Sequence, residues 1–310
     1  NGCDSTAVLN LTINQGDTSY TNITACDSLV WNGTTYDQSG TYSYTGSTIT
    51  NQYSAQFLEV NNNDYIDCGN NLVQGNNFSF TSWVKLSSIT NDVSNIFRQH
   101  PNDGHWLRFL PNSTQINFKL SPIEVSSNTS LNTNQWYHIA TTYDGSIMKI
   151  YINGSLDESL SDSGGFTNYI DPFILGGCVP CNAGEFFDGQ LDNTSIWSTP
   201  LTQQEILNYM NCPPLGNELG LVGYWNFDEG SGSTAYDQTS NGNDGIINGA
   251  TYNTNVPAQS CALTNSNGCD STAILNLTIS ISGCTDSLAL NYNSLVVCDD
   301  GSCSYCDLSF

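Results

Sequence analysis

The sequence of 310 residues predicts an all-β protein. Between residues 5 and 60, apolar and polar side chains alternate in short runs separated by Gly, Asn and Asp, which is typical of antiparallel strands and hairpins. A single segment, residues 201–210, has the signals of a helix, because Thr202 can cap its first turn and Glu205 follows three residues later. We therefore expect sheets joined by turns, with one short helix.

The composition excludes some functions before any motif is considered. Five Lys and Arg stand against 29 Asp and Glu, which gives a formal charge of −24. Such a charge repels nucleic acids and anionic membrane surfaces, and it attracts multivalent cations. Six Trp, 16 Tyr and 12 Phe argue against an intrinsically disordered chain. We therefore expect a folded protein with no nucleic-acid partner.

The cysteines indicate the compartment. Twelve are present, and none stands in a Cys/His spacing that would bind zinc, so we expect disulfides in an oxidising environment. No apolar run approaches the ~18 residues that a membrane span needs. The sequence thus predicts an extracellular protein, secreted or displayed on the cell surface, without a membrane span.

The chain contains an internal repeat. Residues 1–13, NGCDSTAVLNLTI, return at 267–279 as NGCDSTAILNLTI, and the copies differ only where Val8 is replaced by Ile274. Self-similarity of this kind is typical of repeat proteins, whose function usually lies in the array. We therefore expect residues 1–14 to be the tail of a preceding repeat in a larger protein.

The segment from 25 to 44, ACDSLVWNGTTYDQSGTYSY, is separated by more than two hundred residues from TNSNGCDSTAILNLTI at 264–279. Together they resemble the two halves of a short repeat of large secreted Bacteroidetes proteins. An exposed loop accepts an inserted domain whose ends lie close together. The resemblance therefore implies a small Ig-like or β-hairpin module, formed by 15–45 and 262–281, which carries an insertion and pairs Cys26 with Cys269.

The inserted block has five recognisable stretches: NNDYIDCG at 62–69, FSFTSWVKLSS at 78–88, NQWYHIATTYDGSIMKIYINGSL at 134–156, FFDGQLDNTSIWSTPLTQQEI at 186–206 and LVGYWNFDEGSGSTAYDQTSNGNDGIINGATY at 221–252. In combination they resemble a laminin-G-like (concanavalin A-like) jelly roll, which we place at 46–261. In many relatives the YWNFDEGSG segment opens the domain, whereas here it closes it. The resemblance implies a β sandwich with a circularly shifted strand order.

The C-terminal stretch, GCTDSLALNYNSLVVCDDGSCSYC at 283–306, resembles another short repeat of secreted bacterial proteins. Four cysteines in so few residues imply a small stapled module at 282–310, because a core of this size cannot stabilise itself. Four cysteines allow three pairings, and the sequence does not choose among them.

The remaining cysteines lie within the inserted block or beside it. Cys178 and Cys181 have the spacing of a redox motif, but no βαβ pattern surrounds them, so a disulfide that closes a loop is the favoured interpretation. Two further pairings stay open, Cys68 with Cys212 and Cys212 with Cys261.

Oxygen-bearing side chains are densest in the FDEG and DQTSNGNDG stretches, which carry Asp228, Asp237, Asn241 and Asn243. Carboxylate and carbonyl oxygens are the ligands that calcium prefers. The resembled fold often holds structural calcium, so we predict a calcium site here, with Asp192 as a further ligand from a neighbouring strand. The alternative is a loop whose Asx side chains cap their own backbone without a metal.

A glycan site needs an aromatic platform and a few fixed polar groups. The stretch 98–109 supplies Trp106 together with Asp103, His105 and Arg108, and it holds two of the five cationic residues. We therefore predict glycan binding by these four residues. The alternative is that Trp106, which falls in an alternating strand pattern, belongs to the core.

Four Asp-Ser pairs match the D-S/T pattern that secreted Bacteroidetes proteins use for O-glycosylation. The resemblance implies Ser5, Ser28, Ser271 and Ser287 as attachment sites. The alternative is a turn that merely favours Asp-Ser.

The sequence argues against an enzyme, because no GxSxG elbow accompanies His138 and no ExDxxE strand supplies paired acids. The favoured hypothesis is a repeating segment of an extracellular bacterial adhesin or filament. Its jelly roll would bind glycans or cell-surface proteins, and its other partners would be copies of itself. A purely structural, self-assembling filament subunit is the first alternative, and a carbohydrate-active enzyme or its binding module is the second.

Overall fold

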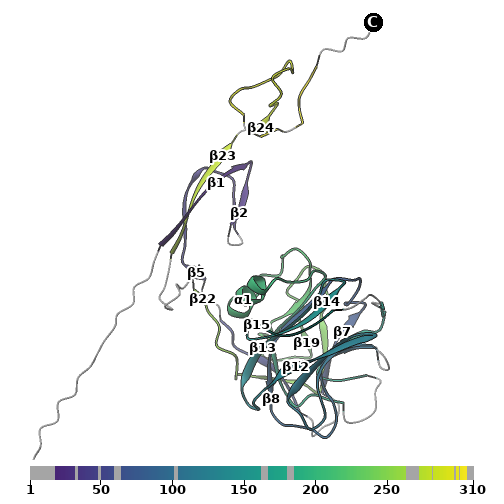
Figure 1. Ribbon diagram of the computed structural model, residues 1–310. Helices are drawn as coiled ribbons and strands as arrows, with labels where there is room; N and C mark the ends of the chain where they lie inside the picture. Colours follow the sequence, from purple (N-terminus) through teal and green to yellow (C-terminus); the bar gives the residue numbers. More distant parts are fainter. Residues whose placement is uncertain are drawn as a thin grey trace, which may run out of the picture. The chain divides into compact units, whose positions relative to one another are not determined.

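The computed structural model describes residues 18–31, 34–47, 50–58, 64–100, 104–161, 167–179, 185–262, 272–280, 282–296, 298–299 and 301–305. The chain divides into two compact units: the larger is Ile49–Ser260, and the smaller combines Asn1–Thr48 with Cys261–Phe310. Strands dominate both units, and the described residues contain one helix, α1 (Gln203–Asn211) (Figure 1). The predicted all-β class is confirmed.

Two antiparallel sheets of eight strands form the larger unit. The first sheet has the order β12-β11-β10-β9-β16-β7-β20-β19. Its strands in chain order are β7 (Tyr65–Asn70), β9 (Ser94–Gln99), β10 (His105–Phe109), β11 (Gln115–Leu120), β12 (Ile123–Ser130), β16 (Pro172–Leu175), β19 (Thr234–Ala235) and β20 (Gly245–Asn248).

The second sheet has the order β15-β14-β13-β8-β17-β6-β21, and β18 pairs with β17. Its strands are β6 (Ser54–Phe57), β8 (Phe78–Leu86), β13 (Trp136–Tyr143), β14 (Ile147–Ile152), β15 (Ser155–Ser161), β17 (Gly189–Trp197), β18 (Leu221–Trp225) and β21 (Thr251–Asn253). Strands β8 and β17 are buried over almost their whole length, which places them at the centre of the unit.

The core lies between the two sheets, where alternate residues of each strand point. Phe97 of the first sheet is fully buried, and its ring centroid lies 4.7 Å from that of Phe80 in the second sheet and 4.9 Å from that of Phe173 in its own. Burying one such ring contributes about 2–3 kcal/mol to stability. Aromatic packing across the interface thus holds the sandwich together.

Helix α1 packs against the second sheet through a separate apolar cluster. Ile206 is fully buried in it, and the ring of Tyr209 stacks on Trp197 of β17 at 4.8 Å. The helix begins with the predicted capping box: the Thr202 hydroxyl accepts from the backbone N–H of Glu205 at 3.3 Å, and the Glu205 carboxylate accepts from the backbone N–H of Thr202 at 2.7 Å.

The smaller unit is built on a three-stranded sheet with the order β1-β23-β4. Strand β1 (Thr18–Cys26) runs parallel to β23 (Thr272–Ser280), and β4 (Gly40–Tyr44) is antiparallel to it. The sheet therefore joins the stretches of chain that precede and follow the larger unit. Three short pairs complete this unit: β2 (Leu29–Trp31) with β3 (Thr34–Tyr36), β5 (Gly46–Ser47) with β22 (Cys261–Ala262), and β24 (Ser282–Gly283) with β25 (Cys298–Asp299).

Among the described residues, two disulfides join parts of the smaller unit to one another, and they correct a prediction. Cys26 bonds Cys298, so the predicted partner of Cys26, Cys269, is wrong. The reason is the parallel register, which pairs Cys26 with Ser280 at the end of β23, whereas Cys269 precedes that strand in the sequence. Cys269 itself lies outside the described residues.

The second disulfide, Cys284–Cys303, lies within the C-terminal Cys-rich stretch. Because Cys298 bonds β1 instead, the four cysteines of this stretch do not pair only among themselves. The stretch is therefore stapled both internally and to the three-stranded sheet.

In the larger unit, Cys68 is free and fully buried in the core, so its pairing with Cys212 is wrong. Cys178, Cys212 and Cys261 are each disulfide-bonded. Cys181 lies outside the described residues. Within the described part of the chain, no helix has the length and apolar character to cross a membrane.

Candidate functional site

Cationic side chains gather around one tryptophan on the first sheet. Leu107 and Phe109 of β10 point into the core, so Trp106 and Arg108 alternate onto the opposite face. The register places Arg98 of β9 and Lys119 of β11 directly opposite Trp106 on its two neighbouring strands. Three of the five cations of the chain therefore meet at this indole.

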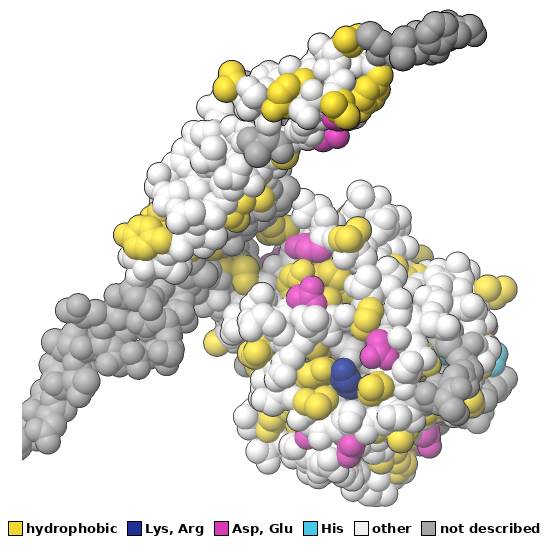
Figure 2. Space-filling view, turned by 45° about the horizontal axis from the view of Figure 1, so that its top comes forward, with side chains coloured by type: hydrophobic (Ala, Val, Ile, Leu, Met, Phe, Trp, Pro, Cys, Tyr) yellow, Lys and Arg dark blue, Asp and Glu magenta, His cyan; other side chains and the backbone are white. Residues whose placement is uncertain are grey.

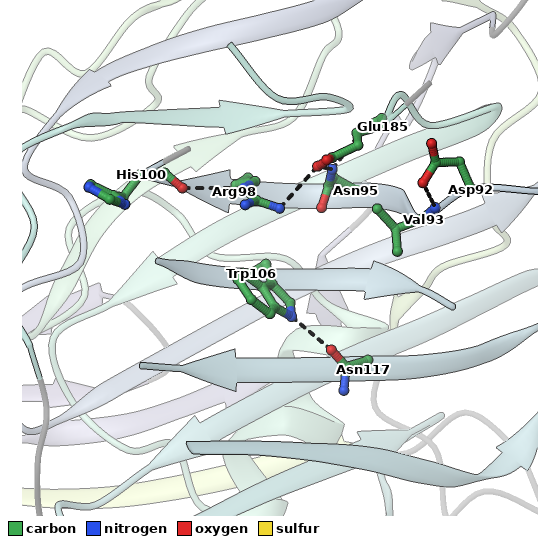
Figure 3. A network of polar contacts seen from close by, with 8 residues as sticks. All are labelled: Asp92, Val93, Asn95, Arg98, His100, Trp106, Asn117 and Glu185. Atoms are coloured by element: carbon green, nitrogen blue, oxygen red, sulfur yellow. Dashed lines mark hydrogen bonds and ion pairs between the residues drawn. The ribbon is translucent and has the colours of Figure 1, made fainter. Parts of the chain in front are cut away.

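The geometry is that of stacked cation–π contacts. The charged groups of Arg108, Lys119 and Arg98 lie 4.1, 4.4 and 4.9 Å from the centroid of the Trp106 ring. The indole Nε1–H donates to Asn117 Oδ1 at 2.7 Å, which fixes the ring on the sheet (Figure 3). We call Arg98, Trp106, Arg108, Asn117 and Lys119 the Trp106 cluster.

The two arginines of the Trp106 cluster differ in their partners. Arg98 donates to Glu185 Oε2 at 3.1 Å and to the carbonyl of His100 at 3.2 Å, and in Figure 3 it extends along β9 between these two groups. Arg108 is half-buried, and its Nε has no hydrogen-bond partner among the described residues. This Nε is shielded from solvent as well as unpartnered.

Burial lowers the pKa of both guanidinium groups, and Arg98 lowers the pKa of Arg108 further by charge repulsion. Nearby carboxylates act in the opposite direction: Glu124, Glu185 and Asp92 raise the pKa of Arg108. An arginine remains charged at any physiological pH. The arrangement can therefore recognise a negatively charged group.

The residues that the sequence predicts to bind glycan lie in different environments. Trp106 lies on the outward face of the sheet, but it is only 5% exposed because the cations cover it. His105 is fully buried, and both ring nitrogens are in contact with backbone groups, Nε2 with the Thr167 carbonyl at 2.9 Å and Nδ1 with the Ser121 N–H at 3.2 Å. Burial lowers the pKa of His105 to about 4. Asp103 lies outside the described residues.

Sequence reasoning counted Arg98 among the cations of the 98–109 stretch without naming it as a binding residue, and it missed Lys119 and Glu185. The signal for Lys119 was the β10–β11 hairpin, whose register brings it opposite Trp106. Glu185 comes from a distant loop, and no local pattern places it beside Arg98.

The predicted calcium ligands separate into two groups. Asp237 lies in the first, and its carboxylate accepts hydrogen bonds of 2.8–3.0 Å from the backbone N–H groups of Tyr224, Thr239 and Asn243 and from the Thr239 hydroxyl. The side-chain amides of Asn241 and Asn243 donate to the Val222 carbonyl of β18 at 2.9 and 2.7 Å. These side chains shape the loop itself, as the alternative interpretation expects.

The second group forms where β17 changes its neighbour. Residues 189–191 of β17 pair with β6, and residues 194–197 pair with β18 on the same edge. Between them the register against β8 shifts, and Asn193 has a φ of +46°, so the strand bulges. The chain entering β6 and the chain leaving β18 therefore meet beside Asp192.

Three oxygen-bearing side chains converge at this bulge, and we call them the Asp192 cluster. Asp192 is fully buried, and its Oδ2 accepts from Asn51 Nδ2 at 2.8 Å. Asp228 Oδ1 accepts from the backbone N–H groups of Gln52 and Tyr53 at 2.7 and 3.0 Å. The cluster thus contains Asn51, Asp192 and Asp228.

Two oxygens of this cluster are buried and have no hydrogen-bond partner among the described residues: Asp192 Oδ1 and Asn51 Oδ1. Burial raises the pKa of Asp192 well above its usual range, and the charge of Asp228 raises it further, against the hydrogen bonds from Asn51 and the Asn193 backbone. Among the described residues no group of three or more His, Cys, Asp or Glu is arranged to hold a metal. The Asp192 cluster has two carboxylates and one amide oxygen.

The amide groups around the cluster are locked in orientation. Asn51 Nδ2 also donates to Gln259 Oε1 at 3.1 Å, and Asn193 Nδ2 donates to the same oxygen at 2.8 Å. Tyr224 donates its hydroxyl to Asn193 Oδ1 at 2.5 Å. Because Asn51 Nδ2 faces two acceptors, its Oδ1 is the atom left unpaired.

Two of the predicted O-glycosylation serines can be placed. Ser28 and Ser287 are exposed, each beside an aspartate in a turn or bend. Ser5 and Ser271 lie outside the described residues.

Comparison with known proteins agrees with this architecture. Residues 60–207 match the family model described as the concanavalin A-like lectin/glucanases superfamily. Mouse pappalysin-1 is 34% identical over 90 residues, which is 27% of this chain and 5% of that protein; human pappalysin-1 is 30% identical over 91 residues. The chain thus spans about one-twentieth of the length of these curated relatives.

Two solved structures share the fold. A candidate carbohydrate-binding protein from Bacteroides ovatus superposes with a TM-score of 0.56 at 20% identity, covering 68% of this chain and 62% of that one. The heptameric SAP-like pentraxin of Limulus polyphemus gives a TM-score of 0.50 at 14% identity, covering 70% of this chain and all of the pentraxin chain. Together with the two packed sheets, these matches identify the larger unit of this chain as a concanavalin A-like jelly roll.

Proposed function

We propose that the jelly roll is a glycan-binding module and that the Trp106 cluster is its binding site for saccharides that carry a carboxylate or sulfate group. The observation that carries the proposal is the concentration of three of the five cations of the chain on one indole, on the outer face of a sheet, in a protein of net charge −24.

The arrangement favours charged over neutral sugars. A neutral pyranose stacks on an open aromatic face, and the Trp106 ring is covered by guanidinium and ammonium groups. A guanidinium forms paired hydrogen bonds with carboxylate or sulfate oxygens, and Arg108 is the partly exposed guanidinium of the Trp106 cluster. An acidic saccharide therefore fits the chemistry of the site.

We further propose that this module belongs to an extracellular bacterial surface adhesin. Disulfides Cys26–Cys298 and Cys284–Cys303 support an oxidising compartment, and the Bacteroides ovatus structure named as a candidate carbohydrate-binding protein supports a sugar ligand. A single site of this kind binds weakly, and the repeat of 1–13 at 267–279 supports an array in which many sites act together. Cell-surface proteins that bear acidic glycans are partners of the same class.

A second function is favoured by the repeat alone. The copied segment contributes strand β23 in its second occurrence, so a purely structural filament of pairing units would use the same feature without any ligand. The proposed role is binding rather than catalysis, and the two histidines that lie in strands, His105 and His138, are fully buried.

A glycan array probed with the 310-residue chain tests the binding proposal. We expect binding to uronate-, sialate- or sulfate-bearing glycans that weakens in 0.5 M salt, because charge recognition is screened. The variant Arg108→Gln should lose this binding, whereas Lys149→Gln, which removes the same charge from β14 of the second sheet, should retain it. Binding to neutral glycans that is unaffected by Arg108→Gln would contradict the proposed site, and a blank array from folded protein would favour the structural filament.

A further inference from the structure

We propose that residues 6–13 form a β strand in the smaller unit of a second copy of this chain, where they take the place that β23 has between β1 and β4. The partner is another copy of the three-stranded sheet, and the contact is a strand exchanged between chains. This contact does not depend on the Trp106 cluster, and it specifies how the units of a structural filament would pair.

The donor segment is a copy of a strand whose partners are known. Residues 6–13, TAVLNLTI, correspond one by one to residues 272–279, TAILNLTI, of β23. The two differ only where Val8 stands for the half-buried Ile274, and both side chains are β-branched and suit a strand. The segment itself lies outside the described residues, so its pairing is inferred from that of β23.

Two leucines and one asparagine hold β23 between its neighbours. Leu275 and Leu277 are 0% and 3% exposed. On the opposite face, the Asn276 side chain donates to Asn22 Oδ1 of β1 at 2.9 Å and accepts from the Thr41 hydroxyl of β4 at 3.0 Å. The same contacts are open to the donor segment, which carries Leu9, Asn10 and Leu11 at the corresponding positions.

The donor segment cannot take this place beside its own β1. Strand β1 is parallel to β23, and its first residue, Thr18, lies opposite Thr272. In the same register Ile13 would lie beside Ala25, close to the other end of β1. The way back along the strand from Ala25 to Thr18 is about 23 Å, whereas the chain from Ile13 to Thr18 reaches at most about 18 Å. Only the sheet of another copy can therefore accept the segment in the register of β23.

An exchange of this kind preserves the contacts of the sheet. A strand from a second copy would make the same hydrogen bonds and bury the same leucines as the β23 that it replaces. A copy's own β23 is favoured in dilute solution, because its tether gives it an effective concentration in the millimolar range. The donor segment and the acceptor sheet are different parts of the chain, so the contact is head-to-tail and its repetition builds an open filament.

Two pairs of substitutions in the 310-residue chain test this contact. Leu275→Asp with Leu277→Asp disables β23 and opens the acceptor sheet, and Leu9→Asp with Leu11→Asp disables the donor segment. Light scattering after gel filtration should show oligomers of the first variant, because its intact donor segments enter the opened sheets of other copies. The chain that carries all four substitutions should remain monomeric.

A labelled peptide of residues 1–14 measures the contact directly by fluorescence anisotropy. It should bind the chain that carries all four substitutions. It should bind the unmodified chain at least about tenfold more weakly, because β23 already occupies the place there. A peptide with Leu9→Asp and Leu11→Asp is the matched control and should bind neither chain.

A milder acceptor variant keeps the test decisive where the aspartates prevent the sheet from folding. Leu277→Ala removes part of one buried side chain and leaves β23 in place. The peptide, which retains Leu11, should bind this variant at least about tenfold more tightly than it binds the unmodified chain. Equal binding to these two chains, including no binding to either, would overturn the proposal, as would equal binding of the two peptides.

Discussion

Buried titratable side chains give this jelly roll its chemical character at the scale of single residues. Asp192, His105 and His138 are each fully buried, and burial is the first cause of the pKa shift in all three. The direction differs with the charge type: the pKa of Asp192 is raised, whereas the pKa values of His105 and His138 are lowered to about 4 and about 3. The interior thus disfavours the charged form of each group.

Because the pKa values of His105 and His138 are lowered by folding, we expect the protein to lose stability in mild acid. Each is neutral in the fold, while in the unfolded chain it takes up a proton near pH 6.5. The unfolded state therefore binds more protons between pH 6.5 and the folded pKa, and stability falls as the pH decreases through this window. Each histidine should lower the free energy of unfolding by about 2 kcal/mol when the pH falls from 7 to 5.

Urea unfolding at pH 7, 6 and 5 measures this effect, with His138→Phe as the comparison. The variant should lose less stability between pH 7 and 5 than the unmodified chain, because one of the two proton-linked groups is removed. Asp192 acts with the opposite sign, since its raised pKa makes stability fall as the pH rises, but this contribution cancels in the comparison. Equal pH dependence in the two proteins would show that His138 does not titrate as a buried group.

At the scale of elements, β17 organises the second sheet. It is buried along its whole length, pairs with β8 on one edge, and divides the other edge between β6 and β18. The bulge at Asp192 and Asn193 is what this division requires, because the two neighbours approach from opposite ends. The Asp192 cluster is a consequence of that strand arrangement.

Elements with local signals were predictable from sequence, and elements that depend on distant pairing were not. The capping box of Thr202 and Glu205 predicts α1, because both residues lie in one turn of the chain. The disulfide Cys26–Cys298 depends on a parallel pairing between β1 and β23. In the sequence, β1 precedes the larger unit and β23 follows it. The same limit applies to the Asp192 cluster: Asp192 and Asp228 were recognised as oxygen ligands, but Asn51 joins them only through the fold.

The cap of α1 provides a quantitative test at this scale. Thr202→Ala removes the side chain that accepts from the Glu205 N–H, so we expect a loss of about 1 kcal/mol and a fall of about 2–4 °C in the unfolding temperature of the jelly roll. Differential scanning calorimetry measures the shift, with Thr133→Ala in a surface loop as the control. A loss in Thr133→Ala as large as that in Thr202→Ala would contradict a specific role of the cap.

At the scale of the whole molecule, acidic and basic side chains are distributed differently. Acidic side chains are spread over the face of the larger unit seen in Figure 2 and do not gather in one patch. Against this diffuse negative field, the Trp106 cluster collects three of the five cations. The net negative charge therefore repels anionic groups at long range, whereas the Trp106 cluster is where the proposed acidic ligand would be attracted at short range.

The disulfide between Cys26 and Cys298 tests how far the two units depend on each other. It closes a sequence separation of 272 residues, for which the chain-entropy description gives about 5.6 kcal/mol. The stabilisation should be smaller, because the jelly roll within this loop stays folded and leaves less chain entropy to lose. The double variant Cys26→Ser with Cys298→Ser should therefore destabilise the smaller unit by less than about 5.6 kcal/mol.

Calorimetry with and without Thr202→Ala measures this, because α1 belongs to the jelly roll and only the unfolding transition of the jelly roll should respond to that substitution. In the double variant the transition that does not respond to Thr202→Ala should fall, and the responsive one should stay in place. The variant Cys284→Ser with Cys303→Ser is the control: it opens a separation of only 19 residues, so its smaller loss should again be confined to the unresponsive transition. If the responsive transition falls together with the other, the two units unfold as one body and the jelly roll is not an independent insertion.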